Sequence, residues 1–227
     1  MVTISIHSYS LSLNHKSVDV IIGEMKDNSQ FKPNYFLGLR ITNHTILENI
    51  EKFQNDIISS NEDIKNFAVA SCKSHVTLPV LQLDKKSEDL EKCIRLLTEN
   101  LKIKTQEHDN KVKFQGVGRF GSRVLFAKPV TGVSFLQSIF SLSQKILTDA
   151  GIKVENKIQY NPHLTLFKVK SGRRKRDDEF NNKIEVDIHK FDDFVFGEEK
   201  VSEVLLLSMN KEKADDGFYY KEASFPI

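Results

Sequence analysis

Two stretches, HVTLPVLQL at residues 75–83 and HLTLFKVK at residues 163–170, share one pattern on which the fold depends. Each begins with histidine, an apolar residue, threonine and leucine, and only these two of the seven histidines show it. Side chains at positions i and i+2 of a β-strand point to the same face. We therefore expect His75 to share a face with Thr77, and His163 with Thr165, while the apolar residues between them point to the other side.

These residue types favour acid–base chemistry at a phosphate. Imidazole has an unperturbed pKa of about 6.5, so one histidine can act as base and another as acid near neutral pH. Threonine hydroxyls can donate to the non-bridging phosphate oxygens, where charge accumulates in the transition state. The sequence therefore predicts His75, Thr77, His163 and Thr165 as the catalytic residues of a phosphodiesterase, and leaves open which imidazole is the base.

Other chemistries fit the sequence less well. No H-E-x-x-H motif, no histidine pair at i and i+4 and no C-x-x-C is present to build a zinc site, so we expect neither a metal nor a cofactor. No G-x-S-x-G segment marks a serine nucleophile. Residues 116–121, GVGRFG, match the dinucleotide fingerprint G-x-G-x-x-G, but a strand-like run follows them where that motif requires a helix. These glycines instead predict a tight hairpin or bulge beside the site.

Composition predicts a globular protein. The 227 residues are 39% hydrophobic and 28% charged, and the net charge of +2 argues against a protein that coats nucleic acid. Any RNA-like ligand must then be small or recognised locally. Cys72 and Cys93 are expected to be free thiols, as in a reducing compartment. Without a long apolar run or a leader pattern at the start, we expect an intracellular protein that does not enter a membrane.

Apolar spacing predicts an irregular mixture of helices and strands. Helical spacing recurs over residues 44–59, 90–101 and 134–151, with a capping box at Thr45 and Glu48 and a stop at Gly151. Strands are expected at residues 34–42, 67–71, 75–83, 112–121, 122–130, 163–170, 201–209 and 218–225, and residues 184–191 are ambiguous. This mixture with hairpins predicts an α+β fold and not a doubly wound parallel sheet.

Two segments stand apart from this pattern. Residues 1–32 are expected to form a loosely ordered N-terminal extension before a single domain at residues 33–227. The basic run at residues 173–176 is typical of a solvated loop. Its less favoured roles are to guide a phosphate-rich ligand or to act as a nuclear import signal. We thus expect a cytoplasmic protein, with the nucleus as a second location if that signal is used.

Several segments together resemble a known family. They are PNYFLGLRITN, HVTL, FQGVGRFG, YNPHLTLFKVK, FGEEKVSEVLLLSM and GFYYKEASF. They are similar to the central domain of the A-kinase anchoring protein 7 family, which lies within the 2H phosphoesterase superfamily together with LigT-type RNA ligases. The resemblance covers residues 33–227.

The resemblance implies a fold and an activity. The fold is LigT-like, with two lobes related by a pseudo-twofold axis that each bring one H-x-T strand to a central cleft between two sheets. The activity is cleavage of 2′,5′-linked oligoadenylates, the second messengers of an antiviral pathway. Tyr160 stands where the related domain has an aromatic residue, so it is a candidate for base stacking, with a core position as the alternative. Phe120 is the second candidate substrate-binding residue.

Two rival functions remain open. One is an RNA-end enzyme that trims 3′,5′ linkages or opens cyclic phosphates, and the other is a non-catalytic nucleotide-binding scaffold. Anchoring proteins of this family carry, beyond this domain, a helix that binds the regulatory subunit of protein kinase A. The residues up to Ile227 show no such helix, so we expect no kinase anchoring and a monomer that binds a short oligonucleotide.

Overall fold

The computed structural model describes residues 30–60, 62–84, 88–103, 110–121, 123–156, 159–169 and 188–227. The chain divides into two units, Met1–Gln30 and Phe31–Ile227, and the helices and strands of the described residues belong to the second. The expectation of a loosely ordered extension therefore falls almost wholly outside the described residues. The basic run at residues 173–176 also falls outside them.

The described residues form a nine-stranded sheet whose strand pairs are antiparallel. The strand order is β7-β3-β4-β6-β2-β1-β8-β9, and β5 also pairs with β2. The strands are β1 (Tyr35–Arg40), β2 (His75–Gln82), β3 (Lys111–Phe120), β4 (Val124–Pro129), β5 (Lys153–Val154), β6 (Leu164–Lys168), β7 (Val195–Lys200), β8 (Glu203–Ser208) and β9 (Tyr220–Pro226). With the helices, this sheet confirms the predicted α+β class. The described strands form one sheet instead of the two that were expected, because β2 pairs with β6.

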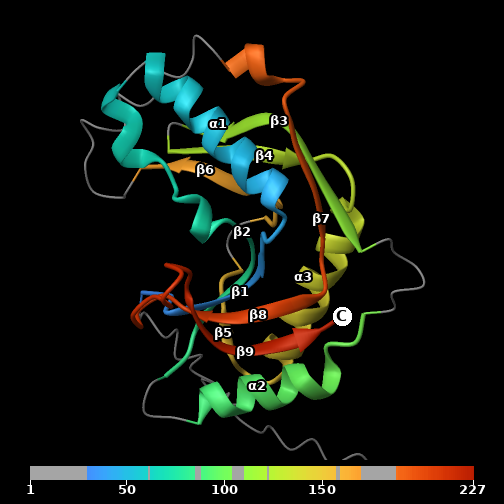
Figure 1. Ribbon diagram of the computed structural model, residues 1–227. Helices are drawn as coiled ribbons and strands as arrows, with labels where there is room; N and C mark the ends of the chain where they lie inside the picture. Colours follow the sequence, from blue (N-terminus) through green and yellow to red (C-terminus); the bar gives the residue numbers. More distant parts are fainter. Residues whose placement is uncertain are drawn as a thin grey trace, which may run out of the picture. The chain divides into compact units, whose positions relative to one another are not determined.

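The strand order forms two halves that meet at β2 and β6. Outwards from this junction, β6, β4, β3 and β7 form one half, and β2, β1, β8 and β9 form the other. Helix α1 (His44–Ser60) packs on the first half, where Phe53 contacts Phe167 and Phe196 (Figure 1). Helices α2 (Asp89–Asn100) and α3 (Val133–Asp149) pack together and contact strands of the second half. The two H-x-T strands thus lie side by side at the centre of the sheet.

Helix α1 follows its predicted spacing but not its predicted cap. Its buried residues include Ile46, Ile50 and Phe53, three or four positions apart, which places them on one face. At its start, the side-chain oxygen of Asn43 accepts from the Ile46 N–H at 3.3 Å. The carboxylate of Glu199 on β7 accepts from the Asn43 N–H at 2.9 Å. The predicted capping box at residues 45–48 is therefore wrong, because the cap combines Asn43 with a residue from a distant strand.

The predicted strand at residues 67–71 is also wrong. Short 3-10 helices η1 (Glu62–Phe67) and η2 (Ser71–Lys73) flank a single bridge residue, Ala68, which pairs with Phe167. Val69 instead donates its N–H to the carbonyl of Leu166 on β6 at 2.9 Å. The segment satisfies its backbone groups on a neighbouring strand without forming a strand itself.

Other expectations agree with the structure. Helix α3 ends at Asp149, and Gly151 follows with φ of 79°, which confirms the predicted stop. Residues Ile188–Phe191, at the end of the segment predicted as ambiguous, form the 3-10 helix η4. Cys72 and Cys93 are free thiols, as expected. Within the described part of the chain, no helix is both long and apolar enough to span a bilayer.

Candidate active site

The register between β2 and β6 brings the four predicted catalytic residues to one face of the sheet. Val76 pairs with Leu164 in an antiparallel ladder, and both side chains are buried in the main core. In such a ladder, directly opposed residues share a face, and the face alternates along each strand. His75 therefore lies opposite Thr165, and Thr77 opposite His163, all four on the face away from the core. These four side chains are half-buried, in agreement with this placement.

Each histidine ring is held by a hydrogen bond to the backbone carbonyl two residues before it. Nδ1 of His75 lies 2.7 Å from the carbonyl oxygen of Lys73, and Nδ1 of His163 lies 2.8 Å from that of Asn161. A carbonyl oxygen can only accept, so in each ring Nδ1 carries the proton and donates it. The neutral rings therefore present an unprotonated Nε2. Each Nε2 can take a proton as a base or, once protonated, give one as an acid.

Two phenylalanines form the wall behind His163. The Phe120 ring meets the His163 ring edge-on at 4.8 Å between centroids, and Phe126 lies 5.4 Å from it. Gly118 pairs with Phe126 across the β3–β4 hairpin, and a Cβ at Gly118 would come within 2.6 Å of the Phe126 ring. The missing side chain at Gly118 thus makes the space in which Phe126 lies.

The glycine-rich segment provides the bulge and the turn of the β3–β4 hairpin, as the hairpin interpretation predicted. Gly116 has φ of 70° and sits where the β3–β4 register shifts, which marks a bulge. Gly121 has φ of 51° in the turn between the two strands. These positions favour glycine because L-residues rarely adopt positive φ. The prediction of a hairpin and bulge beside the site is confirmed.

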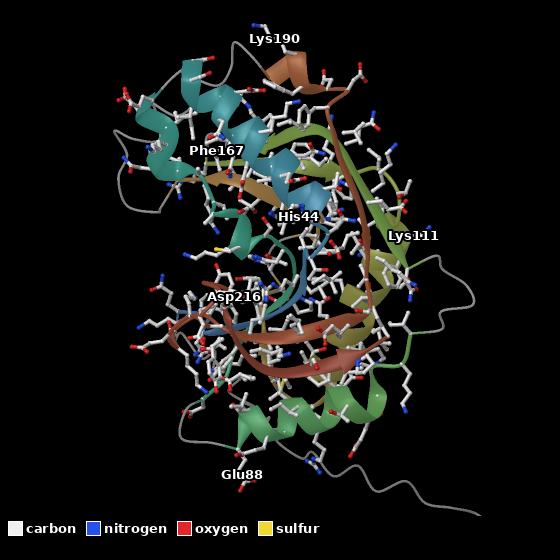
Figure 2. All side chains as sticks on the ribbon, in the orientation of Figure 1. His44, Glu88, Lys111, Phe167, Lys190 and Asp216 are labelled. Carbon is white, nitrogen blue, oxygen red and sulfur yellow. The ribbon has the colours of Figure 1, made fainter. Side chains whose placement is uncertain are left out.

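A second aromatic wall stands against His75. The His75 ring lies 5.1 Å from Phe36 and 5.3 Å from Tyr219, centroid to centroid. Phe36 belongs to a small apolar cluster with Leu205, Leu207 and Phe218, against which Tyr219 also packs. The loop that carries Tyr219 is tied to β1 because Arg40 donates to Asp216 at 2.6 Å (Figure 2 labels Asp216 on this loop).

The surroundings lower the pKa of both imidazoles. Loss of hydration is the main cause for each. At His75 the hydrogen bond to the Lys73 carbonyl opposes it, the positive charges of Lys168, His163 and Lys213 add to it, and the net result is a pKa of about 4. Loss of hydration and the charge of Lys168 also lower the pKa of His163 below 6.5. Without a ligand, His75 is therefore neutral at pH 7, and its Nε2 is available as a base.

Lys168 reaches this face through a bulge in β6. Phe126 pairs with Thr165, but the preceding residue of β4, Leu125, pairs with Phe167, so Leu166 is an extra residue. The shift places Lys168, which pairs with Val124, on the same face as Thr165. Sequence reasoning missed this residue because plain alternation puts it on the core face. The signal was present, because a lysine without a charged partner does not face an apolar core.

Comparison with known proteins identifies the family. The family described as the AKAP7 2′5′ RNA ligase-like domain matches residues 33–227. The chain belongs to this family of 2H phosphoesterases.

Individual relatives agree with this membership. Human A-kinase anchor protein 7 isoform gamma is 32% identical over 215 residues, which cover 92% of this chain but only 61% of the human protein. Escherichia coli LigT, solved with ATP, superimposes with a TM-score of 0.60 at 16% identity, over 86% of this chain and 99% of LigT. A protein described as a phosphoesterase gives a TM-score of 0.58 at 16% identity, over 87% and 99%. The fold is thus LigT-like, as the resemblance implied.

Within this 2H fold, the two candidate substrate-binding residues differ in position. Phe120 touches the ring of His163 and so lies at the site. Tyr160 stacks face to face on Phe140 of α3, with centroids 3.9 Å apart, and packs against the main core. This burial raises the pKa of its phenol. Stacking of a base on Tyr160 stays a prediction, and it would have to use the ring face that Phe140 leaves uncovered.

The side chains that meet at this 2H site are imidazoles, hydroxyls and a lysine. Among the described residues, no group of three or more histidine, cysteine, aspartate or glutamate side chains is arranged to hold a metal ion. Two imidazoles can carry out proton transfer by themselves, and two hydroxyls with a lysine can stabilise negative charge. The arrangement therefore suits acid–base chemistry on an anionic substrate.

Proposed function

We propose that this protein is a metal-independent phosphodiesterase that cleaves 2′,5′-linked oligoadenylates by acid–base catalysis between His75 and His163. The observation that carries the proposal is the pairing of Val76 with Leu164, which sets two identical His-Thr pairs opposite each other on one face. A phosphate between them would meet one imidazole and one hydroxyl from each strand.

We assign His75 as the base of the first step. Its pKa of about 4 leaves it neutral at pH 7, and three positive charges contribute to that low value. Of these three charges, that of Lys168 also lowers the pKa of His163. A bound phosphodiester brings a negative charge, which favours the protonated form of a nearby imidazole and raises its pKa. His163 can then hold the proton that an acid needs.

The reaction follows from these roles. Nε2 of His75 takes the proton of the free 3′-hydroxyl while that oxygen forms a bond to the adjacent phosphorus. The bond from phosphorus to the 5′-oxygen of the next nucleotide breaks, and Nε2 of His163 gives this oxygen its proton. Thr77 and Thr165 donate to the non-bridging oxygens. The hydroxyl is already held beside the phosphorus, so this step needs no activated water, and its product is a 2′,3′-cyclic phosphate.

The comparisons support a small nucleotide as the ligand. The family description names a 2′5′ RNA ligase-like domain. E. coli LigT has been solved in complexes with ATP, with 3′-AMP and with phosphate, so that protein accommodates adenine nucleotides. These findings favour adenylates, and the choice of linkage is our proposal.

The test is incubation with matched 2′,5′- and 3′,5′-linked adenylate trimers in excess chelator, with products identified by mass. We expect the 2′,5′ trimer to be cut to a 2′,3′-cyclic phosphate and the 3′,5′ trimer to be cut much more slowly. A 2′,5′ dimer with hydrogen in place of the attacking 3′-hydroxyl should bind without turnover.

The other outcomes would point to a different function or to a different mechanism. Preferential cutting of the 3′,5′ trimer would support an RNA-end enzyme. Binding without turnover of either trimer would support a nucleotide-binding scaffold. Turnover of the 3′-deoxy substrate would show that water attacks directly and would overturn the mechanism.

A further inference from the structure

Three lysines from separate parts of the chain gather around His75. Lys73 supplies the carbonyl that accepts from Nδ1 of His75, and it is the last residue of η2. Lys168 stands on β6, on the His75 face, because of the bulge at Leu166. Lys213 comes from the loop between β8 and β9, which is drawn in red beside β1 in Figure 1.

Lys213 is held near His75 by an aromatic ring. Its Nζ lies 3.8 Å from the centre of the Tyr219 ring, and that ring meets the His75 ring at 5.3 Å between centroids. A lysine over the face of a tyrosine is attracted by the ring electrons. The loop is fixed in turn by Arg40, which pairs with Asp216 and lies 4.3 Å above the ring of Phe218. The cation–π contact therefore directs the exposed Lys213 side chain towards the Tyr219 ring beside His75.

Lys168 and Lys213 occupy different places relative to the catalytic pair. The charge of Lys168 acts on both histidines, whereas that of Lys213 acts on His75. Lys168 stands on β6, which His163 directly precedes, whereas Lys213 lies over the ring of Tyr219, on the side of His75 that faces β1. Loss of hydration and the charge of Lys73 lower the pKa of Lys213, so the ammonium groups of Lys73 and Lys213 repel each other. Like charges held close together are unfavourable until an anion neutralises them.

We propose that the site has two phosphate-binding places, with Lys168 at the phosphate that reacts and Lys213 at a second phosphate on the His75 side. This inference rests on the proposed function. If His75 takes the proton of the 3′-hydroxyl, the nucleoside that carries this hydroxyl lies on the His75 side. Its 5′-oxygen then continues towards Lys213. The preferred substrate is accordingly a 2′,5′-linked adenylate whose first nucleoside carries a 5′-phosphate.

The experiment compares two dimers, the 2′,5′-linked adenylate with and without a 5′-terminal monophosphate. We expect wild-type kcat/KM to be about 10- to 100-fold higher for the phosphorylated dimer, the range of a charge-assisted hydrogen bond. Lys213→Met should remove this advantage, and Lys213→Arg should keep most of it. Lys168→Met should lower kcat/KM for both dimers by a similar factor and keep their ratio. Lys102→Met, at an exposed lysine after α2, is the control and should match wild type.

A binding measurement tests the second phosphate subsite independently of the proposed phosphodiesterase activity. The same two dimers with a 3′-deoxy first nucleoside are titrated by calorimetry, so affinity is measured without turnover. A preference for the 5′-phosphate that Lys213→Met abolishes supports the second subsite, even if wild type cuts neither dimer and the proposed activity fails. A preference that survives Lys213→Met, or no preference in wild type, overturns the subsite while leaving the phosphodiesterase in place. The melting temperature of each variant confirms that it is folded.

Discussion

Each imidazole of the candidate site is oriented by the carbonyl two residues before it, at Lys73 for His75 and at Asn161 for His163. Because this bond fixes the tautomer and the ring direction, Nε2 does not need a carboxylate partner to be presented to a ligand. The charges around the two rings also differ, since Lys213 lowers the pKa of His75. This difference is the basis for treating them as base and acid.

Removal of either imidazole should slow the reaction severely. We expect His75→Ala or His163→Ala to lower turnover of a 2′,5′ adenylate by about 10²- to 10⁴-fold, because each removes one of two proton transfers. The matched control is His44→Ala, since the His44 side chain is 85% exposed at the start of α1 (Figure 2). Near-normal turnover in either folded catalytic variant would contradict the paired mechanism.

The lowered pKa values predict an acidic optimum. The base must be neutral, so kcat/KM should rise with pH through the His75 pKa of about 4. The acid must be protonated, so kcat/KM should fall as pH rises through the His163 pKa, which lies below 6.5. The profile of kcat should lie at higher pH, because bound phosphate favours imidazolium. Initial rates from about pH 3.5 to 9 check this, and a kcat/KM plateau that continues past about pH 8 would rule out this assignment.

The hairpin of β3 and β4 affects the surroundings of His163, although His163 belongs to neither strand. Phe126 crosses the space left by Gly118 and touches His163. A side chain at Gly118 would therefore act on the site through the ring of Phe126.

Gly118→Ala tests this arrangement. The added Cβ would approach the Phe126 ring to 2.6 Å, so the ring must move, at a cost of about 1–3 kcal/mol in the free energy of unfolding. We expect lower kcat/KM as well, since the ring supports His163. Urea unfolding and kinetics measure both effects. In Gly118→Ala/Phe126→Leu the loss should be smaller than the sum of the two single losses, and simple additivity would count against the contact.

The two halves of the sheet contribute one histidine each, and the pair Val76–Leu164 joins them. A phosphate bound between His75 and His163 would therefore make contacts with both halves. Binding of a ligand to the folded state alone raises its stability by mass action.

A substrate that cannot react should raise the melting temperature. At about 100 times its Kd, a 3′-deoxy 2′,5′ adenylate should add about 2.7 kcal/mol, or roughly 5–10 °C for a chain of this size. In Thr77→Val/Thr165→Val the shift at the same concentration should be smaller, because two donors to the phosphate are lost. Scanning calorimetry gives the comparison. Equal shifts in the two proteins would argue against phosphate binding by these hydroxyls.

Patterns among neighbouring residues were enough to predict the two His-Thr pairs, helix α1 and the glycine-rich hairpin. The alternation in HVTL and HLTL placed each histidine beside its threonine, and the spacing of Ile46, Ile50 and Phe53 placed α1. Both are properties of one element, with periods of 2 and 3.6 residues, so neighbouring residues carry the information. The positive φ values at Gly116 and Gly121 are equally local, and they belong to the hairpin that the glycine spacing predicted.

Contacts between residues far apart in the sequence determined the strand register, the bulge in β6 and the α1 cap. The sequence does not state that Val76 lies beside Leu164, because strand register depends on how both faces pack in the complete sheet. The bulge that turns Lys168 towards the histidines depends on pairing with β4, and the α1 cap depends on Glu199 from β7. In the same way, Lys213 reaches the site through Tyr219 and the loop that Arg40 holds. The chain thus encodes the residue types of the candidate site locally, and their meeting in one site arises from contacts between elements far apart in sequence.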